Sequence, residues 1–323
     1  NPNGDEIFIS ELKKNFDNKI NNFYSSEFIN KNKDHVKKLL SVITSAYSKW
    51  IEKEKEKLNK LDNIFKEQGN SHIENCETAL KRMEEGVNLI VSSKENLEAF
   101  SYANEAMLKQ SQWTEKSNEY QLIWRPFQLG FMLLSAASLI NSKHKDREIL
   151  NLLWFPTGGG KTEAYLLIST FLIFLRRIQT SDSLDYLGIN IFMRYTLRTL
   201  TVQQFQRAAK MILACELIRK KYQSKYTNKL GDKEISIGLW VGAKTTPNRW
   251  TEAKELIYEP EGSSPNQMQI CPCCNDELKW SSNYYTKTIN YLVSPKCKND
   301  KCEIFQLENL PIYTVDDYIY DKK

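Results

Sequence analysis

A run of three glycines followed by a lysine and a threonine is the stretch of this sequence best suited to chemistry. The run comprises Thr157, Gly158, Gly159, Gly160, Lys161, Thr162 and Glu163. Glycines permit a tight turn with inward-pointing N–H groups, and a helix that starts there adds the positive end of its dipole, so the turn can hold an anion. Lys161 would reach the β- and γ-phosphates of a triphosphate, and the Thr162 hydroxyl would bind Mg²⁺. We therefore predict a loop that binds ATP and Mg²⁺, with Lys161 and Thr162 as the catalytic residues.

The sequence around the glycines supports this phosphate loop, although one position departs from the usual pattern. In the pattern G-x-x-x-x-G-K-[ST] the first position is occupied here by Phe155. The alternative is an ordinary glycine-rich turn between a strand and a helix. Apolar residues from Ile149 to Phe155 precede the turn and Ala164 to Leu175 follow it, which is the strand-loop-helix context that the motif requires.

A glutamine about thirty residues before the loop is the candidate for recognising the nucleotide base. The stretch from Trp124 to Gln128 introduces a helix that extends to Ile140, and Pro126 lies near its first turn, where a missing N–H costs nothing. The Gln128 amide could pair with the N6 and N7 edge of adenine. Equally, Gln128 could be a polar residue on an otherwise buried helix, and the sequence leaves both interpretations open.

A second group of polar residues lies where a predicted strand, from Tyr186 to Arg194, leads into a helix that extends through Glu216. Ligands of open α/β sheets bind at such strand ends, and these side chains can donate hydrogen bonds to phosphates. We predict contacts with a nucleic-acid backbone here, and the alternative is a solvated helix start. The predicted contact residues are Arg194, Thr196, Arg198, Thr201 and Gln204.

Cysteine spacing predicts a metal site after the linker-like segment Glu259–Pro265. One pair has C-x₂-C spacing and the other C-x₄-C spacing, which together suit a closed tetrahedral Cys₄ zinc site. The predicted ligands are Cys271, Cys274, Cys297 and Cys302. Cys273 makes one ligand ambiguous, although the C-x₂-C spacing favours Cys271 with Cys274 and leaves Cys273 as a spare.

Composition and charge indicate a globular protein but do not identify its binding partner. The 323 residues contain 45 Lys and Arg against 40 Asp and Glu, a net charge of +5. This mild excess is compatible with a nucleic-acid partner and does not decide for one. No apolar run is long enough to span a bilayer and no signal peptide opens the chain, so we expect a cytoplasmic protein without membrane association.

The first third of the chain is predicted to be helical. Apolar residues from Leu40 to Phe65 recur at helical spacing, which predicts one long amphipathic helix that ends at Gly69 and Asn70. A capping-box pattern at Ser71 predicts the start of a second helix. The Lys and Glu runs are interpreted as a solvated helix face rather than a nucleic-acid contact.

Two adjacent carboxylates, Asp316 and Asp317, follow an apolar segment near the C-terminal end of the sequence. They resemble the acidic motif that holds Mg²⁺ in P-loop ATPases. A strand that ends in carboxylates is common, so we do not place the acidic Walker B motif here.

Together these runs resemble superfamily 2 helicases, and more narrowly the helicase-like subunit of the DISARM bacterial anti-phage defence system. The resemblance covers roughly residues 121–317, and its most specific parts are the Phe-Pro-Thr-Gly-Gly-Gly-Lys-Thr-Glu and Arg-Tyr-Thr-Leu-Arg runs. It implies that residues 158–162 are motif I and that residues 196–204 are the DNA-contacting motif Ia. A D-E-x-H box and a second RecA-like domain are not found, so we expect an N-terminal portion of a longer protein.

The expected fold is α/β, with a RecA-like P-loop domain built on a parallel sheet, a preceding helical region and a zinc-ribbon-like Cys₄ insertion. We predict a helical region at 1–120, the first part of the RecA-like domain at 121–258, the zinc-binding insertion at 259–310 and a return strand at 311–323.

The resemblance implies an ATP-hydrolysing helicase or translocase that acts on DNA, single-stranded or with single-stranded ends, together with other defence-system subunits. On its own, the fragment is not expected to have full activity. The alternative is a non-catalytic DNA-binding zinc module with a vestigial nucleotide loop.

Overall fold

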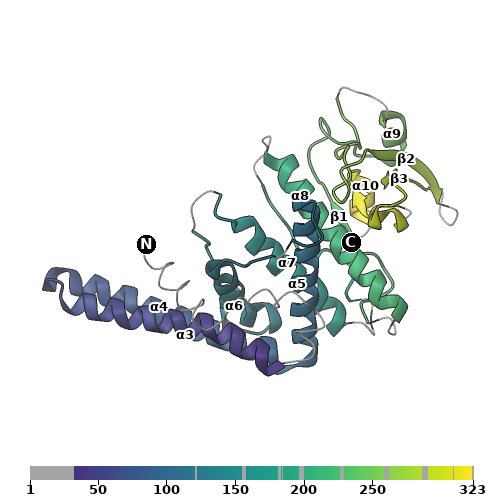
Figure 1. Ribbon diagram of the computed structural model, residues 1–323. Coiled ribbons are helices and arrows are strands. Elements are labelled where there is room, and N and C mark those ends of the chain that lie inside the picture. Colours follow the sequence, from purple (N-terminus) through teal and green to yellow (C-terminus); the bar gives the residue numbers. More distant parts are fainter. Residues whose placement is uncertain are drawn as a thin grey trace. The chain divides into compact units, whose positions relative to one another are not determined.

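The computed structural model shows a mostly helical chain that divides into two compact units (Figure 1). It describes residues 33–120, 122–154, 158–180, 183, 185–195, 200–225, 229–257, 262–285, 290–307 and 309–321. The first unit comprises Asn1–Glu105 and Gln121–Leu175, and the second comprises Ala106–Tyr120 and Arg176–Lys323.

Helices account for most of the regular structure in the described residues, whereas β-structure comprises a pair of eight-residue strands and a pair of two-residue strands. The helical elements are α3 (Lys33–Asn59), α4 (Asn63–Ser92), α5 (Lys94–Glu115), α6 (Pro126–Ile140), η2 (Lys145–Glu148), α7 (Lys161–Gln179), α8 (Leu200–Lys225), α9 (Trp250–Leu256), η3 (Glu303–Gln306) and α10 (Asp316–Asp321). The strands are β1 (Ile237–Gly238), β2 (Leu278–Tyr285), β3 (Asn290–Cys297) and β4 (Ile312–Tyr313). Within the described residues, β1 and β4 form a small parallel sheet and β2 and β3 form an antiparallel hairpin.

Helices α3 and α4 form a long antiparallel hairpin whose turn lies earlier than the sequence suggested (Figure 1). The predicted helix end at Gly69 and Asn70 is wrong, because both residues lie inside α4. The chain turns instead at Lys60–Asp62, where Asp62 is extended. A Cβ on Gly69 would lie 2.2 Å from Leu58 Cδ1, so this glycine allows the two helices to approach closely rather than ending one of them.

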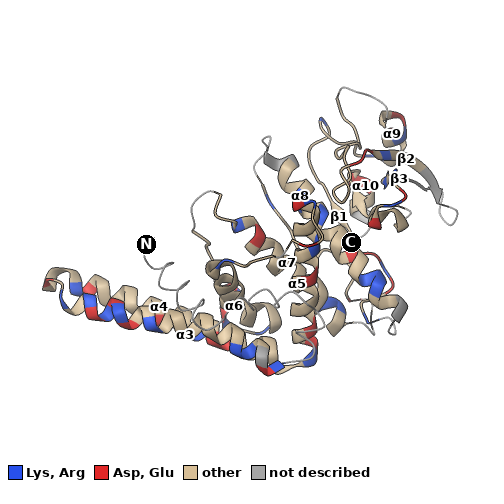
Figure 2. Cartoon of the chain, in the orientation of Figure 1, with Lys and Arg blue, Asp and Glu red and all other residues tan. Residues whose placement is uncertain are grey.

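Charged side chains of both signs alternate along this hairpin (Figure 2). Lys55 illustrates the pattern, since its ammonium lies 2.9 Å from Glu52 within α3 and 2.8 Å from Glu77 of α4. Such exposed pairs contribute little to stability. Their mixed signs agree with the interpretation of these runs as a solvated helix face.

A second glycine brings α4 against α6, the helix that precedes the glycine loop. A Cβ on Gly86 would lie 2.0 Å from the Leu133 carbonyl oxygen, so any side chain here would force the helices apart. Fully buried side chains fill the core of this unit, among them Leu40, Ile51, Ile90, Phe100, Met132, Leu133, Leu166, Phe171 and Phe174. Gly86 therefore permits α4 and α6 to pack closely in the core of this unit.

The large parallel sheet expected of the RecA-like class is not present in the part of the chain that the structure describes. Strands were predicted at 149–155 and 186–194, and the described residues 149–154 and 186–194 are extended or irregular without ladder hydrogen bonds. Parallel strands are normally buried on both faces. Here Leu150, Leu152 and Trp154 are exposed by 92%, 77% and 88%. The expected α/β class therefore reduces to a small parallel sheet in a mostly helical chain, and the RecA-like assignment remains a proposal.

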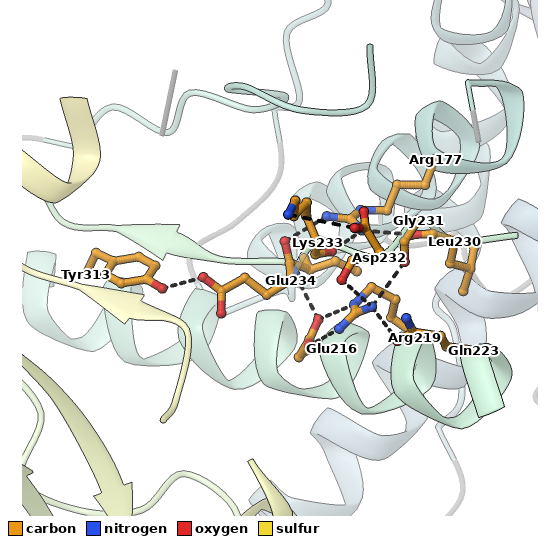
Figure 3. A network of polar contacts seen from close by, with 11 residues as sticks. Arg177, Glu216, Arg219, Gln223, Leu230, Gly231, Asp232, Lys233, Glu234 and Tyr313 are labelled. Atoms are coloured by element: carbon orange, nitrogen blue, oxygen red, sulfur yellow. Dashed lines mark hydrogen bonds and ion pairs between the residues drawn. The ribbon is translucent and has the colours of Figure 1, made fainter. Parts of the chain in front are cut away.

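The small parallel sheet pairs Ile237 with Ile312 and Gly238 with Tyr313. A buried polar network in the second unit holds the segment 230–235 that leads into β1 (Figure 3). Arg177 at the end of α7 donates hydrogen bonds to the carbonyl oxygens of residues 230, 233 and 234 at 2.8, 2.6 and 2.8 Å. Burial is the main cause that lowers the pKa of Arg177 to about 10, which still leaves it charged at neutral pH.

Helix α8 supplies the other half of this network. Arg219 makes a bidentate ion pair with Glu216, at 2.8 and 2.6 Å, and donates to the carbonyl oxygens of Gly231 and Asp232. Glu216 also accepts the N–H of Ile235 at 2.8 Å. Glu216 and Arg219 are almost fully buried. Their ion pair neutralises both charges, which offsets part of the cost of removing them from water.

Candidate phosphate loop and metal centre

The described part of the glycine loop has the strained backbone that only glycine accepts readily. Gly158 has φ +79° and Gly160 has φ +89°, both in the left-handed region. Helix α7 begins directly afterwards at Lys161. Lys161, Thr162 and Glu163 thus lie half-buried in the first turn of this helix, whose N-terminal N–H groups favour anions. Thr157 lies outside the described residues.

The N-terminal end of α6 holds the glycine loop through two hydrogen bonds. Arg125 Nη1 donates to the Gly159 carbonyl oxygen at 2.8 Å, and Gln128 Nε2 donates to the Gly160 carbonyl oxygen at 2.8 Å. The other end of the same amide, Gln128 Oε1, accepts the Arg125 backbone N–H at 2.8 Å. The Gln128 side chain therefore connects the start of α6 to the start of α7.

Gly160 and Gln128 are in close contact. A Cβ on Gly160 would lie 2.7 Å from Gln128 Nε2, so the glycine is required for space as well as for its positive φ. Gln128 is 4% exposed. Both ends of its amide contact the protein main chain, whereas pairing with adenine stays a prediction.

Two further contacts hold the segment that precedes the glycine loop and the segment that precedes α6. Arg82 of α4 lies 2.7 Å from Asp146 Oδ2 and donates to Asn151 Oδ1 at 2.9 Å, which anchors the segment that leads toward the glycines. Trp124 donates from its indole N–H to Asn104 Oδ1 at 2.9 Å. Trp124 is buried, and its hydrogen bond to Asn104 of α5 fixes the position of the residues that precede α6.

The predicted nucleic-acid contacts fall partly outside the described residues. Thr196 and Arg198 are among those not described. Arg194 is exposed, and Gln204 lies half-buried on α8, which also carries Thr201 in its first turn. The contact of these residues with a nucleic acid thus stays a prediction.

The four cysteines with metal-ligand spacing are brought together in the second unit. Cys271, Cys274, Cys297 and Cys302 place their sulfur atoms within 4.8 Å of one another, and Cys273 is not part of this group. The Cys271–Cys302 and Cys274–Cys297 sulfur distances are 3.8 and 3.6 Å. Sulfur atoms around a tetrahedral zinc with Zn–S bonds of about 2.3 Å lie about 3.8 Å apart. The cluster could therefore hold a metal such as zinc.

The four cysteines lie in two short turns and at one end of the β2–β3 hairpin. In the first turn the Asn275 N–H donates to the Cys271 carbonyl oxygen at 2.9 Å, and Asn275 adopts φ +65°, a conformation that asparagine tolerates. In the second turn the Cys302 N–H donates to the Asn299 carbonyl oxygen at 3.1 Å. Asn299 also donates from its side chain to Asp276 at 2.5 Å, which ties the two turns together.

The cluster lies at one end of the β2–β3 hairpin, since Leu278 pairs with Cys297. Its apolar support is small and includes Met268, Leu278, Val293, Ile304 and Leu307, all buried. Burial also raises the pKa of the Cys271 and Cys302 thiols, so a cation is needed to favour their thiolates.

The adjacent carboxylates follow β4, as the sequence suggested, and begin the short helix α10. Asp317 Oδ2 accepts the Trp250 backbone N–H at 3.1 Å. Burial, with a contribution from Asp317, raises the pKa of Asp316. In this structure the pair contacts the start of α9, and no metal-binding role is assigned to it.

Sequence reasoning did not identify Arg125 or Arg82 as residues that support the loop. Arg125 precedes Pro126 at the start of a predicted helix, so its position was visible, but nothing local indicates that its side chain reaches Gly159. Arg82 lies in a region to which no chemistry was assigned. Both contacts join segments that are far apart in the sequence.

In the described part of the chain, no helix is both long and apolar enough to cross a membrane. No family model matches the sequence. The chain is 37% identical over 311 residues to the DISARM protein DrmA of Bacillus paralicheniformis, a match that includes 88% of this chain. It spans only 27% of the length of that relative. Over most of its length the chain is therefore similar to one part of a DISARM protein.

Proposed function

We propose that the chain is the nucleotide-binding portion of an ATP-dependent helicase or translocase of superfamily 2 that acts on DNA. The observation that carries the proposal is the glycine loop, with φ +79° at Gly158 and φ +89° at Gly160, directly before Lys161 at the start of α7. This arrangement presents helix N-terminal N–H groups, a lysine and a hydroxyl at one turn, as a magnesium-bound triphosphate requires.

The similarity to a DISARM protein supports the cellular part of the proposal. We place the chain in the cytoplasm, acting on DNA with single-stranded regions and with other subunits of a defence system. Zinc is the proposed metal of the cysteine cluster, where it would have a structural role.

Lys161→Ala tests the nucleotide site. Removing the phosphate-reaching charge is expected to weaken ATP binding at least about tenfold, roughly 1.4 kcal/mol. Isothermal titration calorimetry with Mg²⁺ and ATP measures the change. Lys143→Ala is the matched control, because it removes an equal charge from an exposed turn in the same unit. Equal ATP affinity in Lys161→Ala and the parent protein would rule out the phosphate loop.

The second candidate is a non-catalytic DNA-binding zinc module with a vestigial nucleotide loop. The cysteine cluster supports this second candidate, because a structural zinc site can stabilise a binding module that has no ATPase activity. DNA affinity measured with and without ATP separates the two functions. A translocase changes its DNA affinity with nucleotide, whereas the zinc module does not.

Arg198→Ala tests the nucleic-acid contact predicted from the sequence. If Arg198 binds a backbone phosphate, its removal should weaken binding to single strands of any sequence and reduce the salt slope by about one contact. Fluorescence anisotropy across a salt series, in the longest form of the protein, measures both quantities. Lys220→Ala, which removes a positive charge from an exposed position of α8, serves as the charge control. Matching slopes for Arg198→Ala and the parent would show that Arg198 lies at a solvated helix start.

A further inference from the structure

The two hydrogen bonds from α6 reach consecutive peptide groups of the glycine loop. Arg125 holds the Gly159 carbonyl oxygen and Gln128 holds the Gly160 carbonyl oxygen, each at 2.8 Å. In a trans peptide the C=O and the following N–H point in opposite directions. Fixing these two oxygens toward α6 therefore turns the N–H groups of Gly160 and Lys161 away from α6. Those N–H groups belong to the turn proposed to receive phosphate.

We propose that Gln128 and Arg125 are positioning residues that orient the backbone of the phosphate loop, and that Gln128 acts on the phosphates through the loop rather than by reading the base. The inference rests on the proposed nucleotide-binding function and specifies how its site is preorganised. An anion nest is effective only when its N–H groups are already aimed at the anion, because no reorganisation is then needed on binding.

The surroundings of Gln128 favour this role over base recognition. The side chain is 4% exposed, so it offers little surface to a base. Its oxygen accepts the Arg125 N–H at 2.8 Å and its nitrogen donates to Gly160. Gly160 packs so closely that an added Cβ would lie 2.7 Å from that nitrogen. Pairing with adenine would have to use the remaining N–H and the remaining oxygen lone pair of an amide that is almost fully buried.

Three ligands separate a loop-positioning role from a base-reading role. ATP and GTP differ in the base, and inorganic tripolyphosphate has no base. If Gln128 positions the loop, Gln128→Met should weaken the binding of all three ligands by a similar factor, about fivefold or more. Arg125→Ala should do the same. Ser138→Ala, a change of similar burial on α6 that leaves the loop contacts intact, should bind all three as the parent does.

A measurement without any ligand tests the positioning directly. In the ligand-free protein the ¹⁵N order parameters of Gly159 and Gly160 should fall in Gln128→Met and Arg125→Ala, from near the rigid value of about 0.85 toward about 0.6. A residue that only contacts a bound ligand would leave them unchanged. Because Arg125 is exposed, its truncation should not unfold the helix, and thermal unfolding checks this for both variants.

The outcomes are distinguishable. Weaker ATP binding in Gln128→Met with unchanged GTP and tripolyphosphate binding would overturn the positioning role and establish Gln128 as a base reader. Unchanged order parameters would also overturn it. Failure of the parent protein to bind tripolyphosphate and both nucleotides would instead remove the proposed nucleotide site, and the inference with it.

Discussion

Cys271→Ser and Cys302→Ser are each expected to abolish the stoichiometric zinc of the purified protein and to unfold the segment from about Gln267 to Leu310. The reason is that the metal-binding free energy of a small Cys₄ unit, about 10–16 kcal/mol for zinc-finger peptides, is also its folding free energy. Among the described residues of the β2–β3 hairpin, the buried apolar side chains are Leu278, Trp280 and Val293. A two-stranded hairpin of this kind is marginal without additional support.

Elemental analysis of protein purified without chelators measures zinc per chain, and limited proteolysis within 267–310 reports the unfolding. Cys273→Ser is the matched control, because Cys273 is a neighbouring half-buried thiol outside the cluster of four. It should retain the metal. Absence of zinc from the parent protein, or full zinc in Cys271→Ser, would contradict the proposed metal centre.

Glu216→Ala is expected to produce the second large effect, a loss of about 3–5 kcal/mol in the stability of the second unit. The substitution leaves Arg219, which is 3% exposed, with an unpaired buried charge. It also removes the acceptor of the Ile235 N–H. The segment 230–235 would lose part of its attachment to α8, and the short β1–β4 pairing that follows should weaken with it.

Thermal unfolding and the proteolytic susceptibility of residues 229–238 measure this effect. Lys220→Ala, at an exposed position of the same helix, is the control and should leave both unchanged. Glu216→Gln should fall between the two, because its amide oxygen can still accept a hydrogen bond while the charge is lost. A Glu216→Ala protein as stable as the parent would show that Arg177 holds the segment without help from Glu216.

Several features could be predicted from the sequence alone because they depend on residues that are close together in the chain. Pro126 marks the first turn of α6, because a residue without an N–H fits that position. The spacing of the four cysteines indicated a metal cluster, because each pair belongs to one short turn. The glycines before Lys161 predicted a tight turn that opens a helix, and the structure has both, with positive φ at Gly158 and Gly160. All of these depend on residues within a few positions of one another.

Tertiary packing decided the remaining features. Gly69 was predicted to end a helix, yet it lies inside α4, where it packs against the end of the Leu58 side chain of the neighbouring helix. The apolar run before the glycine loop reads as a buried strand, yet Leu152 and Trp154 are exposed because the described residues provide no neighbouring strand. Periodicity reports which side chains could be buried, but not which partner is present to bury them.

The glycine loop also combines features that the sequence predicted with contacts that only the tertiary structure revealed. The sequence determined that a glycine loop precedes a lysine and a helix, and that Gln128 lies at the start of an earlier helix. Only the structure showed that the amide of Gln128 and the guanidinium of Arg125 hold two consecutive carbonyl oxygens of that loop. These contacts join residues more than thirty positions apart. The identity of a residue limits the hydrogen bonds that it can make, and the packing of distant helices selects which of them form.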